Sequence, residues 1–162
     1  MKNNIGFTLI EVIIYLALLS IIFGGVAVAV YGIIESTGRE AGRIQLQTEG
    51  DFLLAKINWA FSGAANLTVS TLPPVLTINK YLYQLNPIVF DASSTKMRIK
   101  ESNFLPEDLN NKSVNLTNLT FQNLPSSNQT PEGVKISFSL STSLSGSRII
   151  TKNFQENLYL FK

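Results

Sequence analysis

The sequence predicts an α+β fold, in which one long N-terminal helix carries an antiparallel β-sheet packed on its C-terminal half. Three observations lead to this prediction. The residues from Val12 to Ile34 include no charged side chain, and apolar residues then recur at steps of three and four as far as about Ala65. From Asn66 onward, short alternating runs are separated by turn residues, which is typical of strands in hairpins.

The apolar block is long enough to cross a membrane once. From Val12 to Ile34 an α-helix would extend roughly 34 Å, which exceeds the ~30 Å of a hydrocarbon core. A secretory signal peptide is the less favoured alternative, because its apolar core covers only about 7 to 15 residues. A plain membrane anchor would explain the hydrophobicity but not Glu11, since an acid at the centre of a bilayer costs about 2.5 to 3.5 kcal/mol. Glu11 is therefore predicted to have a function and a partner.

The helix is expected to continue from Phe7 to about Ala65, with an amphipathic second half that needs a sheet to cover its apolar stripe. Trp59 is expected in that core, with an interfacial position as the alternative. Glycines inside the helix are either soft points or sites of close packing. The stripe is formed by Ile44, Leu46, Leu53, Leu54, Ile57, Ala60, Phe61 and Ala64, and the glycines are Gly24, Gly25, Gly38 and Gly42.

The second part of the chain contains nine runs with strand character, and their short connections favour antiparallel hairpins. The segment FLPEDL, residues 104–109, is predicted to form a short helical turn. The predicted strands are LTVST, VLTIN, YLYQL, PIVFD, KMRIK, VNLTNLTF, VKISFSLS, RIITKNF and ENLYLF.

Composition disfavours an enzyme. The chain has no Cys and no His, which removes Ser-His-Asp and Cys-His catalysis and most zinc and copper sites. The acidic residues lack the spacing of a calcium loop, so neither a metal, a cofactor nor a catalytic residue is predicted. The net charge of +2 is too small to indicate a nucleic-acid or acidic partner by itself.

The N-terminal stretch KNNIGFTLIEVIIYLALLS resembles the start of type IV pilins and of type II secretion pseudopilins. The resemblance implies that a membrane prepilin peptidase cuts the leader after Gly6 and that the new N-terminus, Phe7, is methylated. It also implies that Glu11 acts in filament assembly. On this interpretation the chain divides into a leader (1–6), a transmembrane and filament-core half-helix (7–34), an amphipathic half-helix (35–65) and a β-sheet domain (66–162).

Cleavage before Phe7 would supply the missing partner of Glu11. The new ammonium lies four residues from the acid, so it can pair with the carboxylate of its own chain or of a neighbour. The resemblance implies the neighbour, with the membrane, the peptidase and other pilin or pseudopilin subunits as partners. It further implies a single-pass protein of the cytoplasmic membrane, with its C-terminal domain outside the cytoplasm, that later enters a pilus or pseudopilus.

The C-terminal part more weakly resembles W-type minor pilins and J-type pseudopilins, in the order of PIVFDASSTKMRIKES, NLTNLTFQN and GVKISFSLS. This resemblance implies a minor subunit that primes or caps the filament. A pilus-borne DNA-binding or surface-binding module is an alternative, because Lys96, Arg98 and Lys100 share one face of a predicted strand and could meet phosphates. The simpler interpretation of these cations is a solvated sheet face, and a membrane-anchored enzyme is the least favoured alternative.

Overall fold

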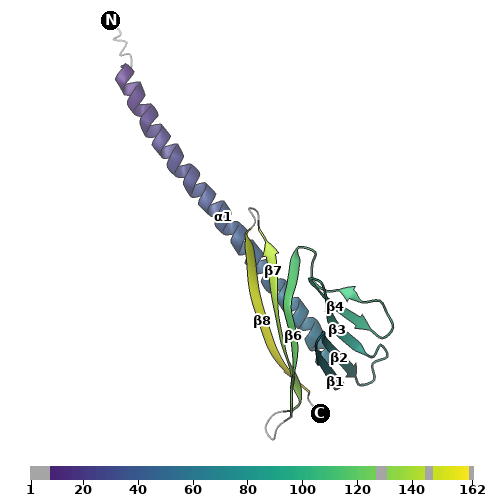
Figure 1. The fold of residues 1–162 in the computed structure, drawn as a ribbon. Coiled ribbons are helices and arrows are strands. Elements are labelled where there is room, and N and C mark those ends of the chain that lie inside the picture. The colour runs from purple at the N-terminus through teal and green to yellow at the C-terminus, as the bar shows by residue number, and fades with distance from the viewer. Residues whose placement is uncertain (1–7, 127–130, 145–147, 161–162) are drawn as a thin grey trace. The chain divides into compact units, whose positions relative to one another are not determined.

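The computed structural model describes residues 8–126, 131–144 and 148–160, and it confirms the α+β class (Figure 1). A single helix, α1 (Leu9–Phe61), precedes all the strands within these residues. The strands are β1 (Ala64–Thr71), β2 (Pro74–Lys80), β3 (Ile88–Ser93), β4 (Lys96–Glu101), β5 (Glu107–Asp108), β6 (Val114–Leu124), β7 (Gly133–Ser143) and β8 (Ile149–Tyr159).

The chain forms two compact units, Met1–Glu40 and Ala41–Lys162, and α1 contributes to both. In the first unit the described helix residues are exposed, except for the half-buried Glu11 and Glu35. The most apolar stretch of α1 is long and hydrophobic enough to cross a membrane, and none of it is buried within the chain. Within the described part of the chain, the apolar side chains of this stretch of α1 are therefore not covered by other residues.

In the second unit, α1 buries one face against the sheets. The buried positions recur at steps of three and four, as the amphipathic pattern predicted. They are Gly42, Leu46, Gly50, Leu53, Ile57, Ala60 and Phe61. Two hydrogen bonds also join α1 to β8. Asn58 Nδ2 donates to Glu156 Oε1 at 3.1 Å, and Lys152 Nζ donates to Gln47 Oε1.

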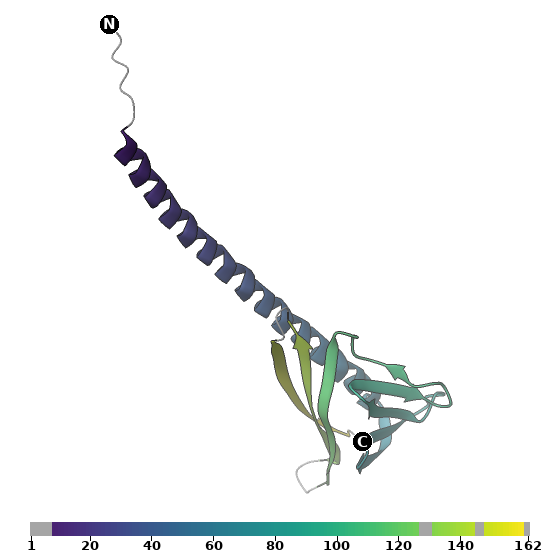
Figure 2. The same ribbon diagram turned by 45° about the horizontal axis from the view of Figure 1, so that its top comes forward.

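The strands form two antiparallel sheets where the sequence analysis expected one. A five-stranded sheet has the order β1-β2-β3-β4-β5, and a three-stranded sheet has the order β6-β7-β8. Figure 2 shows them as separate groups of ribbons. Buried side chains of both sheets and of α1 form one core, which includes Leu53, Phe90, Phe121 and Phe138. The sheets also meet along the backbone, where Leu116 N donates to Thr95 O at 2.8 Å.

The helix ends at Phe61, four residues before the expected end near Ala65. Gly63 adopts a positive φ of 79°, a conformation that glycine takes at the C-terminal ends of helices without the strain other residues incur. Ala64 then begins β1, so the turn is complete within two residues. The periodicity of the apolar side chains continued past the point where the backbone changes direction.

The structure differs from the prediction in three places. Residues 81–85 are not a strand: the Asn86 side chain accepts from Lys80 N at 2.9 Å and donates to Lys80 O and Tyr83 O, which folds this segment into turns. Residues 104–109 form no helical turn, because Glu107 and Asp108 pair with β4 as β5. The two runs predicted at 148–154 and 156–161 are joined in the single strand β8.

Two side chains expected in the core are exposed. Ile44 is 61% exposed, and Trp59 is 40% exposed. The Trp59 ring instead packs edge-on against Tyr83, with ring centroids 5.9 Å apart, beneath the Lys80 ammonium at 4.4 Å from its centroid. Lys80 Nζ also donates to the Trp59 carbonyl at 2.8 Å, so this corner is held by a cation–π contact and a hydrogen bond rather than by burial.

Candidate assembly site on the N-terminal helix

Glu11 occupies the first turn of α1, where the backbone geometry is set by Thr8. The Glu11 N–H faces the Thr8 hydroxyl at 3.4 Å and the Thr8 carbonyl at 3.1 Å, so Thr8 is the N-cap of the helix. Three positions later, a carboxylate is favourable because the amino-terminal end of a helix carries partial positive charge. The spacing Thr-x-x-Glu is a signal that sequence reasoning could have used to locate this helix start.

The Glu11 carboxylate has a hydrogen-bond partner within its own chain. Tyr15, one turn further along α1, donates its hydroxyl to Glu11 Oε1 at 3.3 Å. Glu11 is half-buried, although the residues around it on α1 are exposed. Glu11 stands out in the sequence as a functional residue and Tyr15 does not, although its spacing of four residues from Glu11 is a signal for such a contact.

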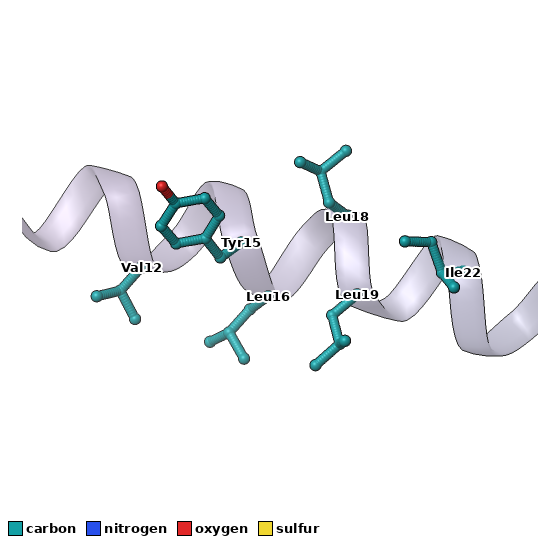
Figure 3. Close-up of a pocket in the computed structure, with 6 residues that line it drawn as sticks. All are labelled: Val12, Tyr15, Leu16, Leu18, Leu19 and Ile22. Carbon is teal, nitrogen blue, oxygen red and sulfur yellow. The ribbon is translucent and has the colours of Figure 1, made fainter.

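A continuous apolar surface follows Glu11 along the helix. Figure 3 shows six residues that line it, with Val12, Leu16 and Leu19 on one side of the helix and the Tyr15 ring on the other. Their side chains are exposed, at about half of their surface each. Between Leu9 and Ile34, Glu11 is the only charged residue. The site is therefore a single carboxylate at the end of an uncovered apolar helix.

Gly6 and Phe7, the predicted cleavage pair, lie outside the described residues, so the structure gives no geometry for them. The comparisons bear on this segment directly. Residues 1–27 match the prokaryotic N-terminal methylation motif. The motif supports a type IV pilin-like or pseudopilin family. No curated protein and no solved structure matches the chain.

The methylation motif indicates a type IV pilin-like or pseudopilin-like precursor of the kind that a prepilin peptidase processes. Together with the apolar part of α1, it supports anchoring in a membrane and assembly into a filament. Proteins with this motif are structural subunits, which is consistent with a role other than catalysis. Among the residues that the structure describes, no group of acidic side chains is arranged to hold a metal ion.

The three cations considered for DNA contact do not form a free basic stripe. Arg98 makes a two-pronged ion pair with Asp91, with both nitrogen–oxygen distances at 2.8 Å, and this hydrogen bonding raises the pKa of Arg98. Lys96 donates to the carbonyls of Asn111 and Val114, and Lys100 is the one exposed side chain of the three. Two of the three charges are thus engaged within the fold, and the structure lends no support to a nucleic-acid partner.

Proposed function

We propose that the chain is a minor pilin or pseudopilin, whose leader is removed after Gly6 and whose new N-terminus, Phe7, is methylated. In this proposal the C-terminal domain lies outside the cytoplasm before assembly. The mature subunit then joins a type IV pilus or a type II secretion-like filament, where it primes or caps assembly.

The observation that carries the proposal is the uncovered apolar half of α1 with its single carboxylate. Such a surface is stable only in lipid or against other apolar helices. The match to the methylation motif favours a position in the membrane first and contact with other helices after assembly. A carboxylate in either environment needs an opposite charge. A neighbouring subunit's N-terminal ammonium supplies that charge, because cleavage before Phe7 creates it four residues, about one helical turn, from Glu11.

The minor role is supported by the order of the C-terminal strands, which resembles minor subunits, and by composition. Major pilins often close their C-terminal region with a disulfide, whereas this chain has no cysteine. Here the engaged side chains of Lys96 and Arg98 weigh against the alternative of a DNA-binding module.

Processing is tested by the intact mass of the protein isolated from its native host. We expect loss of Met1–Gly6 and the addition of one methyl group. A mature chain that still begins at Met1, or that begins near Gly32, would contradict the proposal.

Assembly is tested by Glu11→Ala. This variant is expected to be inserted and cut as in wild type, because the Gly6–Phe7 pair is intact and the span becomes more apolar. It should be absent from sheared filaments, since a buried ammonium left without its partner costs about 3 to 5 kcal/mol. Recovery equal to wild type, at equal membrane levels, would reject the pairing role, and lost processing would instead assign Glu11 to peptidase recognition.

A further inference from the structure

The hydroxyl of Tyr15, a residue that follows Glu11 by four positions on α1, lies 3.3 Å from Glu11 Oε1. We propose that Tyr15 is a positioning residue for assembly: its hydroxyl holds the Glu11 carboxylate by one oxygen and leaves the other for the ammonium of the incoming subunit. This inference rests on the proposed function, since it assigns Glu11 its role in subunit pairing.

A single ammonium cannot satisfy a buried carboxylate. An ionised carboxyl group has two oxygens with about four acceptor sites, and a buried ion pair offsets its desolvation only when further hydrogen bonds satisfy the remaining sites. In water those sites are hydrated, but lipid and packed apolar helices provide no donors. Glu11 therefore needs a second donor that travels with it from the membrane into the filament.

Tyr15 is the side-chain donor placed to do this. The other polar side chains of the described segment 8–34 are Thr8, Ser20 and Tyr31. The Thr8 hydroxyl caps the Glu11 backbone, and the Ser20 hydroxyl donates to the Leu16 carbonyl at 2.7 Å. Tyr31 lies about 30 Å from Glu11 along the helix axis, at a rise of 1.5 Å per residue.

The sequence spacing places the two partners on opposite sides of the acid. In the sequence, Phe7 precedes Glu11 by four residues and Tyr15 follows it by four, so the two residues flank the acid. The ammonium of the incoming subunit then pairs with the carboxylate oxygen that Tyr15 does not hold. The other side chains that line this surface are all aliphatic, so they have no hydrogen-bond donor to offer (Figure 3).

The competing explanation is that the Tyr15 ring only contributes apolar contact area. Tyr15→Phe separates the two explanations, because it keeps the ring and removes the hydroxyl. Tyr31→Phe is the matched control, since Tyr31 lies in the same apolar segment, is 73% exposed, and makes no side-chain hydrogen bond that the described residues show.

The full-length variants are expressed in the native host. The measured quantity is the ratio of the amount of variant in sheared filaments to its amount in the membrane. We expect Tyr15→Phe to lower this ratio roughly threefold to tenfold, the size of one hydrogen bond inside a membrane. Tyr31→Phe should match wild type. In a Glu11→Ala background, Tyr15→Phe should cause no further loss, because the hydroxyl acts only through the carboxylate.

Two results would overturn the inference: a Tyr15→Phe ratio equal to wild type, or an equal fold-loss from Tyr15→Phe with and without Glu11. The second result would need Tyr15 to act on something other than the acid. To keep the second comparison measurable, co-purification with the partner subunits from the membrane replaces recovery from filaments if Glu11→Ala is undetectable in filaments. Failure of the proposed function is a separate outcome, because Glu11→Ala itself would then assemble like wild type.

Discussion

Tyr83 links the turn segment after β2 to the end of β4. Its hydroxyl donates to Glu101 Oε2 at 3.0 Å, and its ring packs on Trp59. Partial burial raises the pKa of Tyr83, and the hydrogen bond to Glu101 and the negative charge of that residue raise it further. The neutral hydroxyl is thus the form that the folded domain favours.

This shift predicts a specific loss of stability at high pH. The pKa of Tyr83 is higher in the folded state than the value of about 10 for an unfolded chain. The stabilising contribution is therefore present below that value and is lost as the pH rises through the folded-state pKa. Thermal unfolding from about pH 8 to about pH 11 should show a smaller decline for Tyr83→Phe than for wild type.

Tyr81→Phe is the control, because Tyr81 belongs to the same turn segment but is 75% exposed. Its decline with pH should follow wild type. Equal declines for wild type and Tyr83→Phe would show that the hydrogen bond to Glu101 does not contribute to stability.

At the scale of elements, Gly50 lets the Phe154 ring of β8 pack directly against α1. A methyl group added there would lie 2.1 Å from Cζ of Phe154, a ring that also stacks on Phe138 at 5.2 Å between centroids. By contrast, a methyl group at Gly24, Gly25 or Gly38 would meet no atom within 4 Å. The glycine that allows close packing is therefore Gly50, with Gly42 beside Leu144 as a second, milder case.

Gly50→Ala is predicted to destabilise the domain. Alanine improves helix propensity by about 1 kcal/mol, but overpacking against a ring typically costs about 1 to 3 kcal/mol, so the net effect is a loss. Urea unfolding of the domain that begins at Arg39 measures it. Adding Phe154→Leu should make the same Gly50→Ala change less harmful, because the smaller side chain vacates the space. A rise in stability from Gly50→Ala alone would contradict this packing.

The elements were predictable where a side-chain period matched the backbone, as for the buried stripe of Leu46, Leu53 and Ile57. The pairing of the strands was harder to predict from the sequence, because hydrogen bonds of local polar side chains decide which segments pair. Asn110 is 4% exposed and binds the backbone of Met97 and Val114, which leads residues 107–108 along β4 instead of into a helical turn. In a chain with many asparagines, nothing in the sequence marks this one.

Of the two residues of the assembly site, one was predictable from the sequence and the other was not. Glu11 stood out because a charge inside an apolar run is energetically costly, and the cost alone predicts a partner. Tyr15 did not stand out, because a tyrosine in such a run is equally consistent with an interfacial ring. Only the rotamers of both side chains show that its hydroxyl reaches the carboxylate.

At the scale of the whole molecule, the core belongs entirely to the second unit. Among the residues that the structure describes, every residue of the hydrophobic core, from Leu46 to Leu160, lies after Glu40. The first unit instead carries the exposed apolar residues of α1. The buried core and the exposed apolar surface of α1 thus lie in different parts of one chain.

This division predicts that the chain from Arg39 onward forms a soluble, monomeric domain rich in β-structure. The truncation removes the exposed apolar surface, and the ion pair between Glu35 and Arg39 that it also removes is exposed and worth about 0.3 to 0.5 kcal/mol. Circular dichroism should show mainly strands with one short helix, and size-exclusion chromatography should give a monomer without detergent. The full-length chain is the comparison and should require detergent. An aggregated or unfolded product would mean that the first half of α1 stabilises the sheets, and the two units would then fold as one.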